Sequence, residues 1–220
     1  MAVQRQAGAV SWGVIAAMFV AAAWAWNRVP DRIPVHWNAA GEVDGYGGRF
    51  MGLLLIPLVT LGMQLLFMVL PAIDPRRANY EGFGKVYGIL CSAIVTFMGA
   101  VYAATTLVAL GHRIDMARVI TVSLGLLFLV LGSLLGRVRP NWFVGIRTPW
   151  TLSSTRSWEK THCLGGRLFA ACGAVILLCG LVRPAWGVFV MLGTILPSTL
   201  AMTAYSYFVW RSDPDRFAGP

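Results

Sequence analysis

Long apolar blocks alternate with shorter polar stretches along the 220-residue chain. A helix needs about 20 consecutive apolar residues to cross the hydrocarbon core of a bilayer. The pattern therefore predicts an all-α membrane protein with six transmembrane helices, of which the fifth is the shortest. The six apolar blocks lie near residues 8–26, 51–72, 86–111, 117–136, 168–182 and 185–209.

Two polar stretches, residues 27–50 and 137–167, are much longer than the others. We expect the first to be a hairpin-like loop outside the cell and the second to be a structured loop in the cytoplasm. On this basis residues 1–72 form a region of two spans with the first loop, and residues 73–220 form a region of four spans with the second. Each long loop follows the first span of a three-span half, so an inverted repeat is one interpretation.

Composition agrees with a membrane protein. Hydrophobic residues make up 57% of the chain and charged residues only 12%, whereas soluble domains have roughly 25% charged residues. The formal net charge is +9, but the basic residues lie between the spans. Contact with anionic lipid and orientation in the membrane explain this charge better than nucleic-acid binding, which we do not expect.

The distribution of Lys and Arg predicts the orientation. With the N-terminus inside, twelve of the basic residues fall in inner segments and six in outer segments. Cytoplasmic loops of membrane proteins are enriched in Lys and Arg. We therefore expect both termini in the cytoplasm, in a multi-pass protein of the bacterial inner (plasma) membrane. The first apolar block is long for a signal peptide, so we interpret it as a retained span.

The first loop reads "PDRIPVHWNAAGEVDGYGGRF". Pro and Gly favour a short hairpin of Val35–Asn38 against Glu42–Asp44, with the Asn38 side chain initiating the turn. One His and two carboxylates at these spacings match no strong metal-ligand pattern, so a self-bonded turn is favoured over a metal site. Exposed aromatic side chains also suit contact with a partner. The candidate binding residues of this loop are His36, Trp37, Asn38, Glu42, Asp44 and Tyr46.

The second loop contains "NWFVGIRTPWTLSSTRSWEKTH". Ser153 or Ser154 is placed to cap a helix, and Trp158 and His162 would then share a helix face. We expect Arg147 to bind a carboxylate or a lipid phosphate, and the three Trp side chains to anchor the loop among lipid headgroups. The candidate binding residues of this loop are Asn141, Trp142, Gly145, Arg147, Thr148, Pro149, Trp150, Trp158, Lys160 and His162.

Both loops resemble known sequence signatures. The stretch "PNWFVGIRTPWTL", followed by "WEKTHCLGG", resembles the signature of SdpI-family membrane proteins, with Cys163 where the family usually has Arg. The stretch "IPVHWNAAGEVDGYGG" resembles the DUF1648 module that usually precedes it, with Gly48 where Ser is common. The two motifs cover about a quarter of the chain, and their order and spacing agree with the six-span plan of the family.

The resemblance implies an immunity function. In the best-known member of the family, the protein protects bacteria that secrete a membrane-active peptide toxin and also holds a cytoplasmic repressor at the membrane. The partners implied here are therefore membrane lipid, a secreted peptide toxin outside and a cytoplasmic transcriptional repressor inside. No cofactor, bound metal or catalytic residue is expected.

Two other classes of function stay open at this stage. A transporter or flippase of a lipid-like or peptide substrate is the first alternative, although Gln64 is the only strongly polar side chain expected at mid-span, which argues against ion coupling. An envelope enzyme or metal-dependent site is the second. Its only acid–base candidates are His36 with Asp44 and His162 with Glu159.

Overall fold

The structure is a computed structural model that describes residues 2–182 and 187–216, and side chains from residue 8 onward. Within these residues, six helices are long and apolar enough to cross a membrane, which confirms the predicted fold class. They are α1 (Ala2–Ala25), α3 (Leu55–Ile73), α4 (Tyr80–Ala109), α5 (Met116–Leu135), α7 (Thr155–Val182) and α8 (Gly187–Arg211). Shorter elements are β1 (Ile33–Trp37), β2 (Val43–Gly47), α2 (Arg49–Leu53), η1 (Arg77–Asn79) and α6 (Pro149–Ser153).

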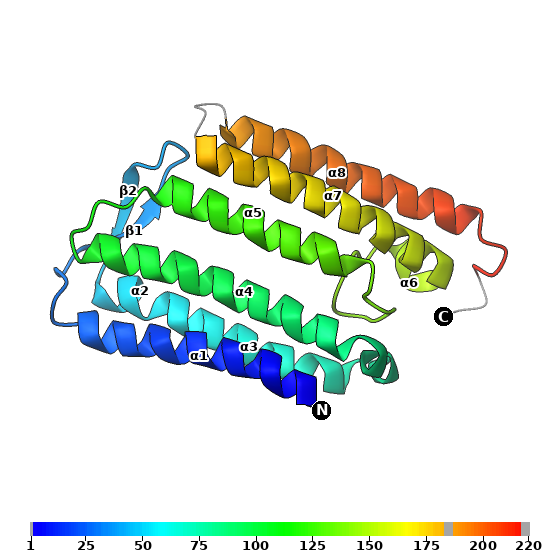
Figure 1. The fold of residues 1–220 in the computed structure, drawn as a ribbon, viewed down its shortest axis with the longest axis horizontal. Coiled ribbons are helices and arrows are strands. Elements are labelled where there is room, and N and C mark those ends of the chain that lie inside the picture. Colours follow the sequence, from blue (N-terminus) through cyan, green and yellow to red (C-terminus); the bar gives the residue numbers. More distant parts are fainter. Residues whose placement is uncertain (1, 183–186, 217–220) are drawn as a thin grey trace.

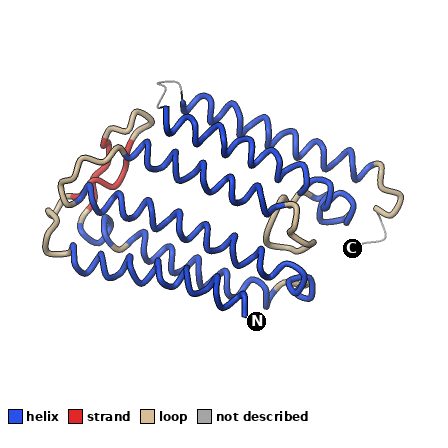
Figure 2. Tube along the Cα trace, viewed as in Figure 1, coloured by secondary structure: helices blue, strands red, loops and turns tan. Residues whose placement is uncertain are grey.

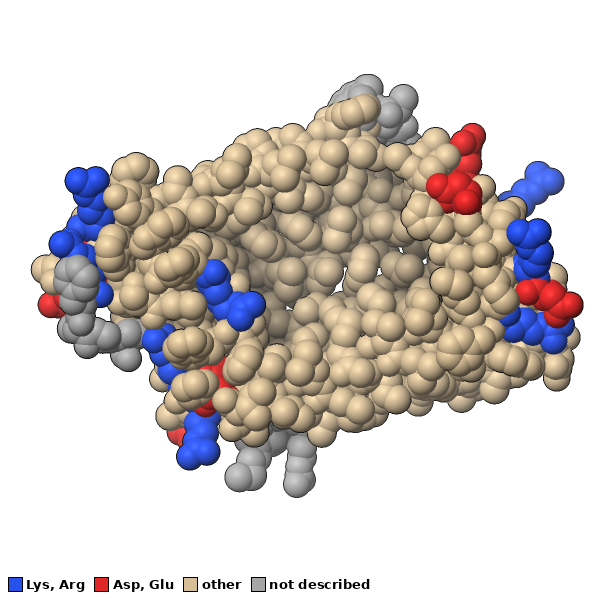
Figure 3. Space-filling model, turned by 180° about the vertical axis from the view of Figure 1, so that it is seen from behind, with Lys and Arg blue, Asp and Glu red and all other residues tan. Residues whose placement is uncertain are grey.

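The long helices expose apolar side chains as a membrane protein must. Val182 is 74% exposed and Leu200 is 70% exposed, both on spanning helices. Many large apolar side chains exposed along helices of this length indicate that hydrocarbon, rather than water, surrounds them. Figure 3 shows the matching charge pattern, because Lys, Arg, Asp and Glu gather toward the two ends and leave a band without charge between them. The chain is a multi-pass membrane protein.

The two long loops lie at opposite ends of the bundle. Figure 1 shows β1 and β2 at one end, and α6, the start of α1 and the end of α8 at the other. We call residues 27–50 the hairpin loop and residues 137–167 the Trp-rich loop, and we name the two ends after them. Which end faces the cytoplasm stays a prediction from the Lys and Arg distribution.

The six spans form two groups of three, α1 with α3 and α4, and α5 with α7 and α8 (Figures 1 and 2). Within the second group α5 packs along α7, and α7 packs along α8. The first group meets the second mainly where α4 packs against α5. We call this line of contact the seam, and each of the two long loops lies at one of its ends.

One boundary differs greatly from the prediction. The fifth span was expected over 168–182, but α7 begins at Thr155 and is continuous to Val182. The helical turns before residue 168, which were not predicted, contain Trp158, Thr161 and His162. These residues lower the mean hydropathy of the segment, but all three are buried. The polar groups are therefore enclosed by protein rather than by lipid, so the helix extends well beyond its apolar part. The fifth span is not the shortest. The sixth was expected from residue 185, and its first two residues lie outside the described part of the chain.

Candidate functional site

The Trp-rich loop is held in shape by Asn141, which is fully buried. The Asn141 amide nitrogen donates to the carbonyl oxygens of Arg139 and Val144, both at 2.9 Å. Its side-chain oxygen accepts from the backbone N–H groups of Phe143 and Val144, at 2.9 and 2.6 Å. All the hydrogen-bonding groups of the amide are thus used by nearby backbone. This confirms that Asn141 ties the turn, and it makes the residue a structural part of the site.

Gly145 and His162 fit against each other. The Gly145 backbone has a φ of 118°, a conformation that side chains other than glycine rarely adopt. A Cβ atom at this position would lie 2.3 Å from Nε2 of His162. The same Nε2 accepts the backbone N–H of Ile146 at 3.0 Å, while Nδ1 lies 2.8 Å from the carbonyl oxygen of Trp158. The neutral imidazole therefore donates from Nδ1 and accepts at Nε2, and so fixes the path of the loop.

Trp158 lies in the core and not at the lipid surface. Its side chain is fully buried, its indole N–H donates to the carbonyl oxygen of Val138 at 2.8 Å, and its ring stacks on His162 with centroids 4.0 Å apart. The shared helix face of Trp158 and His162 is confirmed. The expected headgroup anchor at Trp158 is wrong, because the early start of α7 turns this indole into the space between α4 and α5.

The helix α6 starts at a capping box. The Thr148 hydroxyl accepts the backbone N–H of Thr151 at 3.2 Å, and the Thr151 hydroxyl accepts the backbone N–H of Thr148 at 2.9 Å. Pro149 occupies the first turn, where its missing N–H costs nothing. Trp150 packs edge-on against Tyr207 of α8, with ring centroids 5.2 Å apart. These motif residues therefore shape the short helix and attach it to α8.

The start of α7 is tied to the end of α8. Ser154 caps α7 by accepting the backbone N–H of Ser157 at 2.9 Å, which confirms one of the two expected caps. The Ser154 hydroxyl donates to Asp213 at 2.5 Å, and this hydrogen bond holds the pKa of Asp213 below its ordinary value. The hydroxyls of Thr148 and Ser206 also lie 2.9 Å apart, so this contact joins the Trp-rich loop to α8 as well.

Asp74, which sequence reasoning did not single out, connects the Trp-rich loop to the first group of helices. Its side chain is only 2% exposed. Its carboxylate accepts three hydrogen bonds, from the backbone N–H of Arg76 at 2.7 Å, the Tyr80 hydroxyl at 3.1 Å and the backbone N–H of Trp142 at 3.0 Å. The only available signal was an acidic residue directly before Pro75 at the end of a span.

Two further hydrogen bonds strengthen this connection. Arg76 donates to the carbonyl oxygen of Leu152 at 2.9 Å, and Asn79 donates to the carbonyl oxygen of Pro140 at 2.7 Å. Together with Asp74 they attach the segment between α3 and α4 to the Trp-rich loop. We call this set of contacts the Asp74 strap.

Other motif residues remain on the surface of the Trp-rich end. The Trp142 side chain is 46% exposed, and the Arg76 guanidinium lies 6.0 Å from the centre of its ring. Arg147 is exposed and donates to the carbonyl oxygen of Trp142 at 2.7 Å. Lys160 is also exposed. These side chains, and not the buried Trp158 and His162, are available to a partner.

The hairpin loop forms the expected hairpin, with slightly longer strands than predicted. Strands β1 and β2 pair antiparallel, and the Asn38 side-chain oxygen accepts the backbone N–H groups of Ala40 and Glu42 at 2.9 and 3.0 Å. This confirms that Asn38 initiates the turn. Gly41 follows with a φ of 83°. A Cβ at Gly45 would lie 2.8 Å from Cβ of His36, so the glycines of this loop allow close pairing of the strands.

His36 and Asp44 meet across the hairpin. Nδ1 of His36 lies 2.5 Å from a carboxylate oxygen of Asp44, and the Asn38 amide donates to Glu42 at 3.0 Å. Tyr46 is 54% exposed, with the Arg32 guanidinium 5.3 Å from the centre of its ring. Trp37 is half-buried. The hairpin therefore presents a mixed acidic and aromatic surface.

Of the two acid–base candidate pairs, only His36 and Asp44 are brought together in the structure. Glu159 is exposed and its carboxylate lies 4.0 Å from Arg139, whereas His162 is buried and bonded to backbone, so these two side chains are not brought together. Among the described residues, no three His, Cys, Asp or Glu side chains gather as metal ligands would. His36 with Asp44 is a pair of side chains near the surface, bonded to each other.

A six-span bundle with a hairpin at one end and a strapped, Trp-rich loop at the other defines the class, a multi-pass membrane protein. Residues 13–61 match the family model "Domain of unknown function (DUF1648)", and residues 137–206 match the "SdpI/YfhL protein family". The chain is also 19% identical to "Immunity protein SdpI" of Bacillus subtilis (strain 168), over 90% of this chain and 93% of that protein. No solved structure matches the chain. Together the two family matches and the similarity to a membrane immunity protein along nearly the whole chain support an SdpI-family protein.

Proposed function

We propose that this protein protects the cell that makes it against a secreted, membrane-active peptide toxin. The observation that supports this most is the similarity to an immunity protein over 90% of the chain. In this proposal the hairpin loop contacts the toxin at the outer surface of the plasma membrane. The Trp-rich loop lies inside the cell, where it responds to the toxin by recruiting a cytoplasmic transcriptional repressor.

The surface of the hairpin loop supports contact with a peptide. Tyr46 and the pair of His36 and Asp44 are exposed on a hairpin whose backbone is held by Asn38 and by packing of Ile33 in the core. Aromatic side chains supply contact area at low cost in conformational entropy, and the carboxylates Glu42 and Asp44 suit a cationic group on a peptide. A rigid support lowers the entropy lost on binding.

The surface of the Trp-rich loop supports contact with a second partner. Trp142 and Arg147 are exposed next to each other, because the Arg147 guanidinium donates to the Trp142 carbonyl oxygen. Trp and Arg are the residue types that most often dominate protein interfaces. The Asp74 strap and the imidazole of His162 hold the backbone beneath them, so the pair does not depend on lipid for its position.

The protective function is tested by deleting the gene and exposing the cells to culture supernatant of the parent strain. We expect growth of the deletion strain to be inhibited and to recover when the gene is restored. Restoring the His36→Ala, Tyr46→Ala double variant should give weaker protection at equal membrane abundance. As a matched control, the lipid-facing Phe208→Ala variant should protect fully. Unchanged sensitivity of the deletion strain would contradict the proposal.

Recruitment is tested separately with a photo-crosslinking amino acid at position 147 in living cells. We expect a cytoplasmic repressor to be captured from position 147 and not from Arg211, an exposed cation at the end of α8. The Trp142→Ala variant should abolish this capture while leaving the protein in the membrane. Capture that is equal from both positions, or unaffected by Trp142→Ala, would argue against recruitment through this loop.

A further inference from the structure

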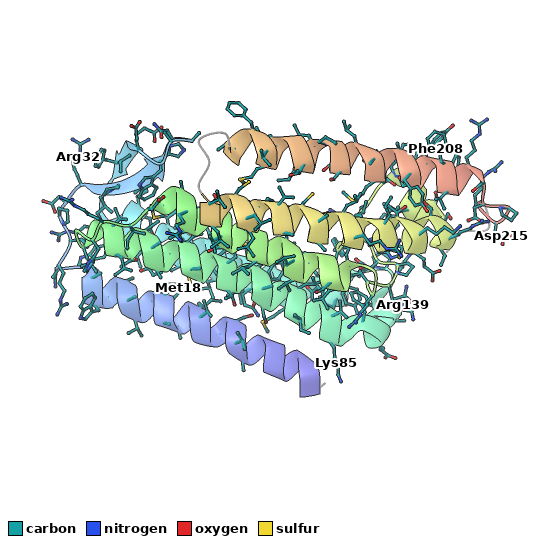
Figure 4. The ribbon with its side chains drawn as sticks, turned by 45° about the horizontal axis from the view of Figure 1, so that its top comes forward. Met18, Arg32, Lys85, Arg139, Phe208 and Asp215 are labelled. Carbon is teal, nitrogen blue, oxygen red and sulfur yellow. The ribbon has the colours of Figure 1, made fainter. Side chains whose placement is uncertain are left out.

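We propose that the Trp-rich end of the seam is a binding site for one anionic phospholipid, with the phosphate headgroup held by Lys85, Arg137 and Arg139. The three cations come from two elements. Lys85 lies in the second turn of α4, while Arg137 and Arg139 follow directly after α5. Figure 4 shows Lys85 and Arg139 at the same end of the bundle. This site is independent of the proposed immunity function.

A cavity of about 720 Å³ opens between these elements. It is lined by the start of α4, the end of α5 and the first residues of the Trp-rich loop, including all three cations. A second cavity of about 590 Å³ extends to Arg76 and shares four lining residues with the first, Gly82, Arg139, Pro140 and Glu159. Figure 3 shows that the molecule is also hollowed between its two helix groups. The volumes are in the range of ordinary ligand sites.

The charge of the cavities favours an anion. Four cations line them, Lys85, Arg137, Arg139 and Arg76, against two carboxylates, Glu81 and Glu159. The one ion pair across the cavities is weak, since Arg139 and Glu159 are 4.0 Å apart and their side chains are 61% and 60% exposed. In the described part of the chain, Lys85 and Arg137 form no ion pair. Nη1 of Arg76 is buried without a hydrogen-bond partner.

The apolar part of the lining favours a lipid over a free anion. Below the cations the larger cavity is lined by Val86, Ile89 and Leu134, and Ile89 is 45% exposed on a spanning helix. A phospholipid places its phosphate at the level of the helix ends and its acyl chains beside such side chains. Inorganic phosphate would use only the charged rim. Basic pockets between spanning helices are suited to anionic headgroups for this reason.

The test uses the purified full-length protein and native mass spectrometry with added lipid. Phosphatidylglycerol, which is anionic, and phosphatidylcholine, which is zwitterionic, are compared with identical acyl chains, so that only the headgroup differs. We expect one phosphatidylglycerol to bind more tightly than phosphatidylcholine. The Lys85→Gln, Arg137→Gln double variant should lose about tenfold or more of this affinity, since it removes two of the three cations that hold the phosphate.

Two further variants separate binding from folding. The Arg167→Gln, Arg211→Gln control removes the same charge from exposed positions that do not line the cavities, and it should bind phosphatidylglycerol like the parent. Glu159→Gln removes a carboxylate from the cavity and should tighten binding severalfold, which a variant that merely damages the fold would not do. Equal affinity for the two lipids, no loss in the double variant, or weaker binding by Glu159→Gln would each overturn the proposal. Displacement of the lipid by millimolar inorganic phosphate would show a small-anion site instead, and would also overturn it.

Discussion

Single atoms decide the shape of the Trp-rich loop. Because Gly145 has no Cβ, Nε2 of His162 can lie directly against its backbone. The same nitrogen accepts the backbone N–H of the next residue, Ile146. The "GI" of the motif and the His that follows it 17 residues later are therefore one structural unit. In this chain Gly145 and His162 pack against each other, and the buried imidazole does not face a partner.

Replacing Gly145 with Ala should destabilise the protein by about 2 kcal/mol or more, because a positive φ and a clash with His162 act together. The measurement is thermal unfolding in detergent. Gly62→Ala is the matched control, since a Cβ there meets nothing within 4 Å and Ala favours a helix more than Gly does. If both variants melted at the parent temperature, the packing described for His162 would be wrong.

Asp74→Asn should loosen the Trp-rich loop. All three partners of the carboxylate are donors, so the amide nitrogen of Asn would face a donor and leave a buried group unsatisfied, at a cost of about 1–3 kcal/mol. We expect faster hydrogen exchange at the backbone N–H of Trp142 and its neighbours. Asp31→Asn, in which the parent side chain is 92% exposed, should leave exchange in this loop unchanged. Equal exchange in the two variants would contradict the Asp74 strap.

At the scale of single residues, a contact could be predicted from the sequence only when its two partners lie close together along the chain. The turn at Asn38, the tie at Asn141 and the cap at Ser154 bond to backbone within four residues. The first two were predicted correctly, and Ser154 was one of the two predicted caps. Asp74 bonds to a backbone N–H 68 residues away, and Trp158 bonds to a carbonyl oxygen 20 residues away. Contacts at such separations follow from the packing of helices, which a local motif does not contain.

The tightest pair of elements is α5 with α7, and its glycines explain why. A Cβ at Gly132 would lie 2.5 Å from the backbone nitrogen of Ala170, and one at Gly173 would lie 2.7 Å from that of Leu129. Gly125 meets α7 in the same way, with 2.6 Å to Leu177. Small residues let helix backbones approach closely in lipid, where no hydrophobic effect drives association. The sequence suggested close packing, but it did not identify which helices pair.

Gly132→Ala should push α5 and α7 apart and destabilise the protein by about 1–3 kcal/mol, because the atoms that the new methyl group meets are backbone and cannot turn away. Gly132→Leu should be worse. The free energy of unfolding in mild detergent tests this. Gly193→Ala in α8, where a Cβ meets nothing within 4 Å, serves as the control. A Gly132→Ala variant as stable as Gly193→Ala would show that the backbones are farther apart than described.

Hydropathy predicted the existence of all six spans but failed at the start of α7. Ser157, Thr161 and His162 read as loop residues, yet they are fully buried on a helix. Two of the three satisfy their polarity inside the protein: Ser157 donates to the carbonyl oxygen of Ser206 at 2.8 Å, and both ring nitrogens of His162 are bonded to backbone, whereas the Thr161 hydroxyl has no hydrogen-bond partner among the residues that the structure describes. A scale based on transfer into lipid underestimates a helix whose polar turns face other protein elements.

At the scale of the whole molecule, the predicted orientation has a direct test. With Cys163 replaced by Ser, because it is the one exposed native cysteine among those described, single cysteines are introduced at Tyr46 and at Lys160. A membrane-impermeant maleimide should label position 46 in intact cells and position 160 only after permeabilisation. The reverse pattern would place the Trp-rich loop outside and would also overturn recruitment of a cytoplasmic repressor by this loop.

The hairpin and the Asp74 strap each connect the two helix groups, and they do so at opposite surfaces of the membrane. The base of the hairpin belongs to the first group, since Ile33 packs with Met18 and Tyr102. The tip leans on the second group, where a Cβ at Gly41 would meet Ala117 of α5 at 3.3 Å. A force applied at the hairpin tip therefore acts on both helix groups, which meet along the seam.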